Sequence, residues 1–247
     1  MHLKTILLTR PPGANKSLAD LFRAAGLLPI VRPLIELVEK PVDLEMKRIA
    51  LDLDRYDKII FVSKSSVRFG LPILENYWPQ WPISLDWFSV GPGTAEALKQ
   101  HGVVASFPDL AGSEGLLALA GLQEVAGEQI LIVRGAGGRE LLGQSLGESG
   151  ASVTYLETYR RLLLQHDFSD LVAGSIVILT SAEILENFTS LSGESLHGYH
   201  AVVPSSRLEG IARTHVFQGV TNAGGASDEA LYDAVIKVIN TSGIANE

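Results

Sequence analysis

Residues 88–98 read Phe88-Ser89-Val90-Gly91-Pro92-Gly93-Thr94-Ala95-Glu96-Ala97-Leu98. A short β-type run ends in Gly-Pro-Gly, and good helix formers follow Thr94, which is typical of a strand, a tight turn and a helix start. We expect Thr94 to cap this helix, because its side-chain oxygen can accept a free backbone N–H. The first N–H groups of such a helix face the carboxyl end of the strand, where they favour an anionic group.

The same alternation of short apolar runs and helix-type segments continues along the chain. Strand-type runs lie at 6–10, 28–32, 58–62, 103–107, 130–134, 153–159 and 175–180, with helix-type stretches such as 17–25 and 44–53 between them. Strands that alternate with helices predict parallel sheets whose two faces are covered by helices.

Four segments recur in the same order, which predicts an internal duplication. Residues 129–135 echo 5–11, 175–181 echo 57–63, 201–206 echo 89–94, and 227–231 echo 113–117. The first correspondence also aligns Gly26 with Gly150 at two predicted helix ends. We therefore expect two similar α/β halves, and the repeat alone allows two consecutive lobes. Ligands of parallel sheets bind at the carboxyl ends of the strands, so two facing halves predict a cleft there.

Composition limits the classes of function. The 247 residues carry a formal charge of −8, which argues against non-specific nucleic-acid binding because that needs a broad basic face. The chain has no cysteine, which excludes disulfides, thiolate catalysis and cysteine-ligated metals. The apolar run near the N-terminus is too short for a signal peptide, and no run approaches membrane-spanning length. We expect a cytoplasmic protein that does not bind membranes.

Three common kinds of site are not supported by the motifs. The glycine run at Gly91 lacks the third glycine of a dinucleotide fingerprint, since Glu96 stands in its place, and Glu140 does so in the run at Gly135. The six histidines are scattered, and only His197 and His200 are closely spaced, so we assign no metal. No G-x-S-x-G motif predicts a hydrolytic serine.

Four hydroxyl side chains stand at or near predicted helix starts: Ser63, Thr94, Ser181 and Ser206. An N-cap role explains each residue type by itself. Their recurrence at symmetric positions favours a shared role in binding, and both interpretations remain open at this point.

Cationic and phenolic side chains add a second group of candidates. Arg10 and Arg134 follow matching strands at the end where a ligand would lie, and Lys64 and Arg139 stand early in predicted helices. An isolated arginine is usually a solvated surface charge, whereas a cluster at strand ends suits recognition of carboxylate or phosphate groups. Tyr159 precedes two arginines in an alternating strand, where it is either a half-buried strand residue or a hydrogen-bond donor.

These features together resemble one known family, the uroporphyrinogen-III synthases, over essentially the whole chain. The motifs that carry the resemblance are Ile6 to Pro11, Ile60-Phe61-Val62-Ser63-x-x-x-Val67, Ser89 to Leu98, Ile130 to Gly135, Tyr159-Arg160, Ile178 to Ser181 and Pro204-Ser205-Ser206. Each motif is soft, and the specificity lies in their order and spacing.

The resemblance implies an α/β fold of two similar flavodoxin-like lobes, joined by a two-stranded β ladder, with the active cleft between them. One lobe would comprise 1–34 with 167–247, the inserted lobe 50–154, and the connection 35–49 with 155–166. It also implies closure of the linear tetrapyrrole hydroxymethylbilane to uroporphyrinogen III, with inversion of the last pyrrole ring and loss of water. The enzyme would be a hydro-lyase without a metal or other cofactor.

The resemblance also implies roles for individual residues. Tyr159 matches the tyrosine most often given the role of acid for the departing hydroxyl. The residues matching Ser63, Thr94, Ser181 and Ser206 line the family's cleft, although Ser206 stands where many members carry threonine. We expect these four, with Arg10, Lys64, Arg134 and Arg139, to bind the substrate's eight carboxylates. We expect a monomer that receives hydroxymethylbilane from the preceding deaminase.

Two functions of other classes remain as alternatives. The first is a cytoplasmic bilobal module that binds a small polyanionic ligand without chemistry. The second is a nucleotide-dependent transferase, which needs a phosphate-binding loop that the sequence does not contain.

Overall fold

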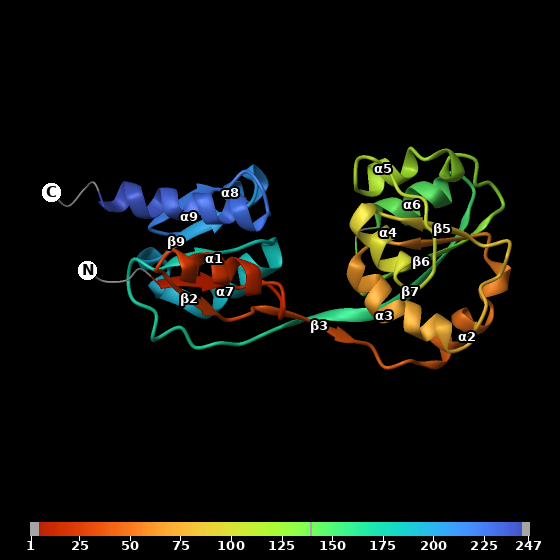
Figure 1. Cartoon of the computed structure of the whole chain (residues 1–247), viewed down its shortest axis with the longest axis horizontal. Coiled ribbons are helices and arrows are strands. Elements are labelled where there is room, and N and C mark those ends of the chain that lie inside the picture. Colours follow the sequence, from red (N-terminus) through yellow and green to blue (C-terminus); the bar gives the residue numbers. More distant parts are fainter. Residues whose placement is uncertain (1–4, 139, 244–247) are drawn as a thin grey trace. The chain divides into compact units, whose positions relative to one another are not determined.

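The computed structural model of the chain describes residues 5–138 and 140–243 (Figure 1). Its strands form two five-stranded sheets, and the chain divides into two compact units. Unit 1 comprises Met1–Leu37 with Leu162–Glu247, and unit 2 comprises Val38–Arg161. The fold is therefore α/β with two parallel-sheet cores, as the sequence pattern predicts.

Unit 1 is built from both ends of the chain. Its elements are β1 (Thr5–Leu8), α1 (Lys16–Ala24), β2 (Leu28–Val31), β8 (Ile176–Ile178), α7 (Ala182–Ser192), a 3₁₀ segment (Gly193–Gly198), β9 (His200–Val203), α8 (Ser206–Ala212), β10 (Gly219–Asn222) and α9 (Asp228–Gly243). The sheet order is β10-β9-β8-β1-β2, and every pair is parallel.

The core of unit 1 has two layers because successive strand residues point to opposite faces of the sheet. Leu7 and Val177 pack with residues of α7 and α8, while Ile6 and Ile178 pack with residues of α1 and α9. All four strand residues are fully buried, so helices cover both faces of the sheet.

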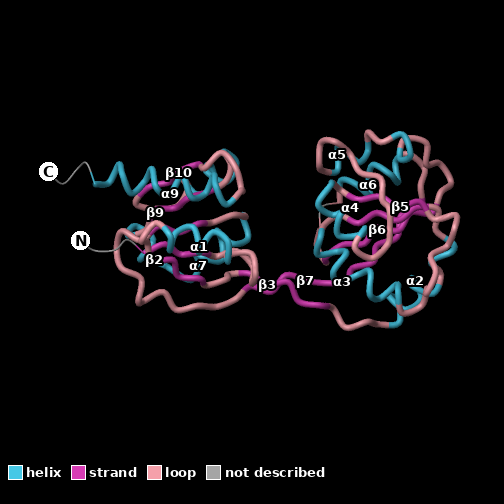
Figure 2. Tube along the Cα trace, in the orientation of Figure 1, coloured by secondary structure: helices cyan, strands magenta, loops and turns pink. Residues whose placement is uncertain are grey.

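Unit 2 is continuous in sequence. Its elements are β3 (Ile35–Glu39), α2 (Leu44–Leu51), β4 (Lys58–Phe61), α3 (Lys64–Glu75), β5 (Asp86–Ser89), α4 (Pro92–Lys99), α5 (Ser113–Leu117), β6 (Gln129–Gly135), α6 (Leu141–Glu148) and β7 (Ser152–Leu163), with 3₁₀ turns at Leu53–Arg55 and Ala120–Leu122. The sheet order is β3-β7-β6-β4-β5, and β7, β6, β4 and β5 are parallel. Figure 2 shows its strands with helices around them.

The two faces of this second sheet are covered in the same manner. Phe61 and Val133 pack with residues of α2, α3 and α4, and Ile60 and Ile132 pack with residues of α5 and α6. Each sheet thus holds its strands in a fixed register between two helical layers.

The duplication predicted from the sequence is present in the topology. The order β9-β8-β1-β2 in unit 1 corresponds to β5-β4-β6-β7 in unit 2. The register agrees as well, since Ile6 pairs with Ile176 in one sheet and Ile130 pairs with Lys58 in the other. The alignment of residues 5–11 with 129–135 and of 57–63 with 175–181 is therefore confirmed.

The two aligned glycines end equivalent helices. Gly26 follows α1 with φ of 73°, and Gly150 follows α6 with φ of 90°. Glycine adopts this left-handed conformation without the steric cost of a side chain, which explains the residue at both helix ends.

The predicted correspondence of residues 89–94 with 201–206 is wrong by two residues. The predicted cap of α4 is wrong as well. The pairing of β5 and β9 with β4 and β8 places Gly91 opposite Ser205, and these residues are the N-caps of α4 and α8. Thr94 is therefore not a cap. The reason is Pro92, whose fixed φ suits the first helical position, so that α4 begins before Thr94. Ser206 is likewise the first residue inside α8.

Residues 103–107, predicted as a strand, make only the isolated parallel bridge between Phe88 and Ser106. The bridge lies on the side of β5 that faces away from β4. In unit 1, β10 takes the same position beside β9, so the segment around Ser106 corresponds to β10. The segment is a strand in position but too short for a regular ladder.

The chain passes between the units twice, at 37/38 in β3 and at 161/162 in β7, and these two strands are neighbours. Both crossings fall inside the segments 35–49 and 155–166 that we expect to connect the lobes. Residues 44–49 of that expected connection instead belong to α2, since Asp43 accepts the N–H of Met46 and starts a helix there.

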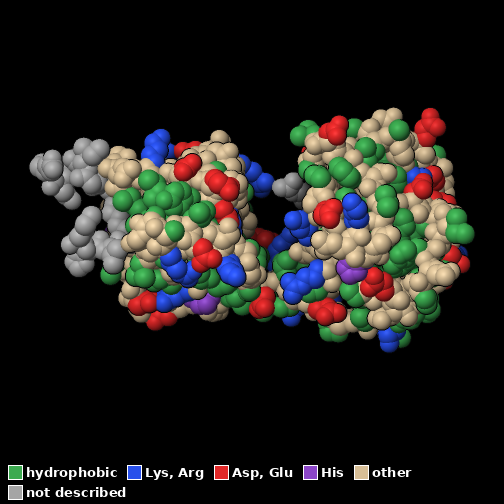
Figure 3. Space-filling view, in the orientation of Figure 1, with side chains coloured by type: hydrophobic (Ala, Val, Ile, Leu, Met, Phe, Trp, Pro, Cys, Tyr) green, Lys and Arg blue, Asp and Glu red, His purple; other side chains and the backbone are tan. Residues whose placement is uncertain are grey.

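Acidic and basic side chains are mixed over the face shown in Figure 3. Within residues 5–138 and 140–243, no helix combines the length and apolar character that crossing a membrane requires.

The contact of α3 with β6 gives a test of the packing in unit 2. A Cβ added at Gly70 would collide with the buried side chain of Val133. We predict that Gly70→Ala lowers the free energy of unfolding by about 1–2 kcal/mol, since overpacking outweighs the gain in helix propensity. Urea unfolding followed by circular dichroism measures the change.

Gly147→Ala is the matched control, because Gly147 also lies in a helix of unit 2 and a Cβ there would meet no atom within 4 Å. This variant should gain about 0.5–1 kcal/mol from helix propensity. Equal shifts in the two variants would contradict the packing account.

Candidate functional site

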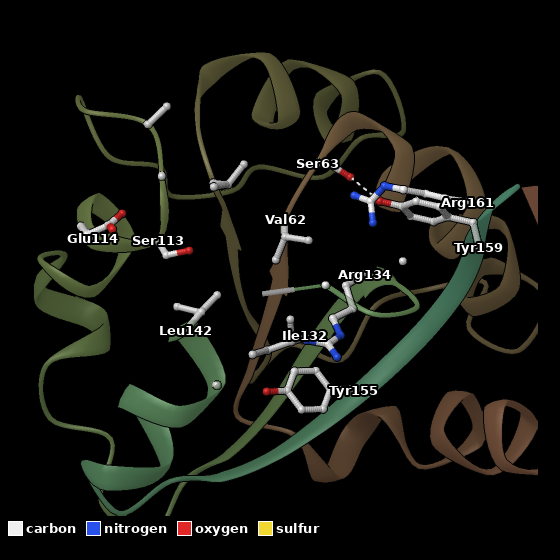
Figure 4. A pocket seen from close by; sticks show the side chains of 16 residues that line it. Val62, Ser63, Ser113, Glu114, Ile132, Arg134, Leu142, Tyr155, Tyr159 and Arg161 are labelled. Atoms are coloured by element: carbon white, nitrogen blue, oxygen red, sulfur yellow. Dashed lines mark hydrogen bonds between the residues drawn. The ribbon is translucent and has the colours of Figure 1, made fainter. Parts of the chain in front are cut away.

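A pocket of about 430 Å³ opens in unit 2 at the carboxyl ends of its parallel strands. It is lined by Val62, Ser63, Val90, Ala111, Gly112, Ser113, Glu114, Ile132, Arg134, Gly135, Gly138, Leu142, Gly143, Tyr155, Tyr159 and Arg161. Figure 4 shows these side chains in three groups: Ser63 with Tyr159 and Arg161, Arg134 with Tyr155, and Ser113 with Glu114. This edge is where parallel α/β sheets generally bind ligands.

Ser63 is placed at the pocket by the start of α3. It is the N-cap residue, and its Oγ accepts the backbone N–H of Ser66 at 2.9 Å. The Ser66 hydroxyl in turn lies 3.1 Å from the backbone nitrogen of Ser63 and accepts its N–H, which completes a capping box. The reciprocal bonds fix the Ser63 side chain at the end of β4.

A β-bulge in β7 sets the direction of the Tyr159 side chain. Arg134 pairs with Glu157, but the next residue, Gly135, pairs with Tyr159, so Thr158 is the extra residue. A bulge turns the following side chains relative to the regular alternation. Gly135 is required opposite the tyrosine, because a Cβ there would lie 2.5 Å from the Tyr159 ring.

The Tyr159 side chain is buried beside Phe69, Ser63 and Arg161. Its residue is only 5% exposed, and its ring lies 5.2 Å from that of Phe69, centroid to centroid. Its phenol oxygen is 3.1 Å from Oγ of Ser63. Figure 4 shows the guanidinium of Arg161 beside this pair. A phenol, a hydroxyl and a cation are thus gathered at one end of the pocket.

Arg134 is a buried cation that pairs with two glutamate side chains of the same chain. Its side chain is 8% exposed, and its Nη2 donates to Glu140 at 2.8 Å and to Glu157 at 3.1 Å. Burial lowers the pKa of the Arg134 guanidinium, but the hydrogen bonds to Glu140 and Glu157 outweigh it and the pKa is raised overall. Its carbon Cζ also lies 3.9 Å from the centre of the Tyr155 ring. The guanidinium is therefore permanently charged and already compensated.

Tyr155 and Glu140 form the other half of this cluster. The Tyr155 hydroxyl donates to Oε2 of Glu140 at 3.1 Å. Burial, followed by this hydrogen bond and the Glu140 charge, raises the pKa of the Tyr155 phenol. The hydrogen bond from Arg134, with its charge, lowers the pKa of the Glu140 carboxyl. Near neutral pH the phenol is protonated and the carboxyl ionised.

Three of the residues predicted to bind substrate or catalyse line this pocket: Ser63, Arg134 and Tyr159. Lys64 and Thr94 do not line it. Lys64 is exposed and its side chain packs against Gly93, whereas Thr94 is 5% exposed within the first turn of α4. Arg139 lies outside the described residues.

The remaining three predicted residues belong to unit 1. Arg10 forms a salt bridge with Asp228 and donates to the carbonyl oxygen of Ala226 at 2.8 Å. Ser181 caps α7 by accepting the N–H of Ile184 at 3.2 Å, and Ser206 accepts a hydrogen bond from Asn222. The ligand roles expected for these residues remain predictions.

Sequence reasoning missed the acidic partners of Arg134 and the contribution of α5. In the sequence, Glu140 stands out only because it replaces the third glycine of a dinucleotide motif, and no motif singles out Glu157. The alternation of β7 was a usable signal, since it places Tyr155 and Glu157 on one side of the strand. Ser113 and Glu114 open the segment 113–117 that residues 227–231 echo, and nothing in the sequence marks them as pocket residues. Among the described residues, no group of histidine and acidic side chains is arranged to hold a metal ion.

The cluster predicts a pH-dependent signal. In Glu140→Gln, the pKa of Tyr155 should fall toward the ordinary tyrosine value, because the charge and the acceptor that favour the neutral phenol are weakened. In the unaltered protein the raised pKa makes stability fall as pH rises from the ordinary tyrosine pKa through the pKa of Tyr155 in the folded state. In the variant these two pKa values lie closer together, so the total loss of stability over this pH range should be smaller. NMR titration of ¹³Cζ-labelled tyrosine measures the pKa.

Glu148→Gln serves as the control, since Glu148 is an exposed residue of α6 that accepts a hydrogen bond from Gln144. A Tyr155 pKa that is the same in both variants would contradict the Glu140 contact.

The chain resembles known proteins throughout its length. Residues 16–233 match the family described as "Uroporphyrinogen-III synthase HemD". The chain is 33% identical over 245 residues to the uroporphyrinogen-III synthase of Salmonella typhimurium, covering 94% of this chain and 99% of that protein. It is 32% identical over 244 residues to the Escherichia coli enzyme, with the same coverage.

Solved structures share the fold. The Helicobacter pylori uroporphyrinogen-III synthetase aligns with a TM-score of 0.63 at 16% identity, over 95% of this chain and 99% of that one. A mutant uroporphyrinogen III synthase of Thermus thermophilus aligns with a TM-score of 0.62 at 15% identity, over 96% and 99%. From the family match and the two bacterial relatives, the chain belongs to the uroporphyrinogen-III synthase family.

Proposed function

We propose that the chain closes hydroxymethylbilane to uroporphyrinogen III, with inversion of the last pyrrole ring and loss of water. Family membership supports the reaction, since the relatives that align over 99% of their length are uroporphyrinogen-III synthases. The observation that carries it for this chain is the Ser63–Tyr159 contact of 3.1 Å inside a pocket at the strand ends.

Tyr159 is the proposed acid for the departing hydroxyl. The Oγ of Ser63 already accepts the N–H of Ser66, so the Ser63 hydroxyl hydrogen is available to Tyr159. When Ser63 donates to the phenol oxygen, the phenol hydrogen is left for a ligand in the pocket. Tyr159 then donates to the hydroxyl as it leaves, and the proton released on ring closure restores the phenol.

Binding of the substrate is proposed to rest on charge and on geometry together. The substrate carries eight carboxylates, and helix N-termini such as that of α3 present free N–H groups and a positive dipole end at the pocket. Holding both ends of a flexible tetrapyrrole in one geometry lowers the entropic part of the barrier. The proposed carboxylate ligands are Lys64, Thr94, Arg134 and Arg139 of unit 2, and Arg10, Ser181 and Ser206 of unit 1. Ser63 is proposed to meet the substrate together with Tyr159, to which it donates its hydroxyl hydrogen.

Further properties belong to the same proposal. The reaction is a dehydration, which makes the enzyme a hydro-lyase, and acid catalysis with positioning needs no cofactor. We also propose that the enzyme is a cytoplasmic monomer and receives its substrate from the preceding deaminase.

An isomer assay tests the reaction. Purified protein is supplied with hydroxymethylbilane, the product is oxidised, and type I and type III porphyrins are separated by chromatography. Unaided closure gives type I, so protein-dependent type III is the expected result. Type I alone, from folded protein, would overturn the synthase proposal and favour a module that binds a polyanion without chemistry.

The role of Tyr159 has its own test. Tyr159→Phe should lower kcat for type III formation about 100-fold, the scale of a lost general acid, with the fold intact by circular dichroism. Tyr77→Phe is the control, because Tyr77 packs against the core of unit 2 outside the pocket. Undiminished turnover in Tyr159→Phe would remove this residue from the mechanism while leaving the reaction in place.

A further inference from the structure

Two donors in the pocket converge on one carboxylate of the protein itself. Arg134 donates from Nη2 to Oε1 of Glu140 at 2.8 Å, and Tyr155 donates from its hydroxyl to Oε2 of the same residue at 3.1 Å. Both donors line the pocket and lie side by side in Figure 4. A guanidinium and a phenol that share the two oxygens of one carboxylate form a complete carboxylate-binding arrangement.

The carboxylate in this arrangement is far more accessible than its partners. The Glu140 side chain is 63% exposed, whereas that of Arg134 is 8% exposed. Glu140 occupies the N-cap position of α6, but its side chain makes no capping hydrogen bond and therefore does not stabilise the helix start. Ion pairs with an exposed partner contribute little net stability. Glu140 can therefore leave at low cost.

Arg134, in contrast, needs an anion at all times. A buried cation without a partner is strongly destabilising. Glu157 supplies one lasting partner, since its Oε1 accepts from Nε of Arg134 at 3.3 Å and from Nη2 at 3.1 Å. Glu157 is also held by Lys40 at 3.6 Å on its other oxygen. The site therefore has one fixed carboxylate and one exchangeable carboxylate.

We propose that Arg134 and Tyr155 form a carboxylate subsite that Glu140 occupies in the free protein, and that a carboxylate of the ligand takes its place. The proposal rests on the proposed function, whose substrate carries eight carboxylates, and it assigns one of them a receptor. The exchange keeps one negative charge and two acceptor oxygens beside Arg134. The guanidinium is already desolvated, so the ligand does not meet that cost again.

The exchange also gives the subsite its selectivity. A neutral amide or hydroxyl group cannot replace the charge of Glu140, so displacement by such a group leaves Arg134 undercompensated. The lowered pKa of Glu140 agrees with an ionised occupant at neutral pH. Glu140 therefore favours an anionic substituent over a neutral one at this position.

Binding of uroporphyrin III, the stable oxidised form of the proposed product, tests the subsite without turnover. Fluorescence titration at constant ionic strength gives the Kd. In Glu140→Gln the neutral side chain competes less well, and Kd should fall about two- to fivefold, as expected for loss of an exposed ion pair. In Arg134→Gln the Kd should rise, and adding Glu140→Gln to it should no longer improve binding.

Tyr155→Phe provides a second background in case Arg134→Gln does not fold, and there the gain from Glu140→Gln should shrink. Glu148→Gln, on the same helix, should leave Kd unchanged. Unchanged or weaker binding in Glu140→Gln, or an equal gain in the Arg134→Gln background, would overturn the proposal. A gain in binding together with a failed isomer assay would keep the subsite and reject the proposed function, so the two failures are distinguishable.

Discussion

The parallel pairing of the strands is the constraint on which the rest of the structure depends. Because neighbouring strands run in one direction, their carboxyl ends meet at one edge of each sheet, and the helices that follow begin there. In unit 2 this places the cap of α3, the end of β6 and the start of α5 around one pocket. The first turns of these helices therefore present their backbone N–H groups at one edge of the sheet.

Much of this framework could be predicted from the sequence because it depends on local patterns. Apolar runs, glycines after helices and serines before them fix the elements, and Ser63, Ser181, Gly26 and Gly150 behave as local rules require. Thr94 shows the limit of such rules. Threonine and glycine are both acceptable caps, and the proline at the first helical position decided in favour of Gly91.

The electrostatic state of the arginines could not be predicted in the same way, because their partners come from other elements. Arg10 meets Asp228, which is 218 residues away, and Arg134 meets Glu157 on the neighbouring strand β7 and Glu140 at the start of α6. Equivalent positions in the two sheets thus carry cations that are neutralised by the chain's own carboxylates. An arginine at a strand end is a good indicator of an anion-binding site. Its partners in the folded chain decide whether an anionic ligand binds directly or must first displace a carboxylate of the protein.

The discontinuous composition of unit 1 has a consequence for how the chain is made. The inner strand β1 is synthesised before its neighbour β8, which comes about 170 residues later. Unit 2 lies wholly between them, so its sheet can be completed while the ribosome still holds the second part of unit 1. Closing so long a loop is entropically slow when the segment is unstructured. A folded unit 2, entered and left by the paired strands β3 and β7, shortens that search for the two parts of unit 1, residues 1–37 and 162–247.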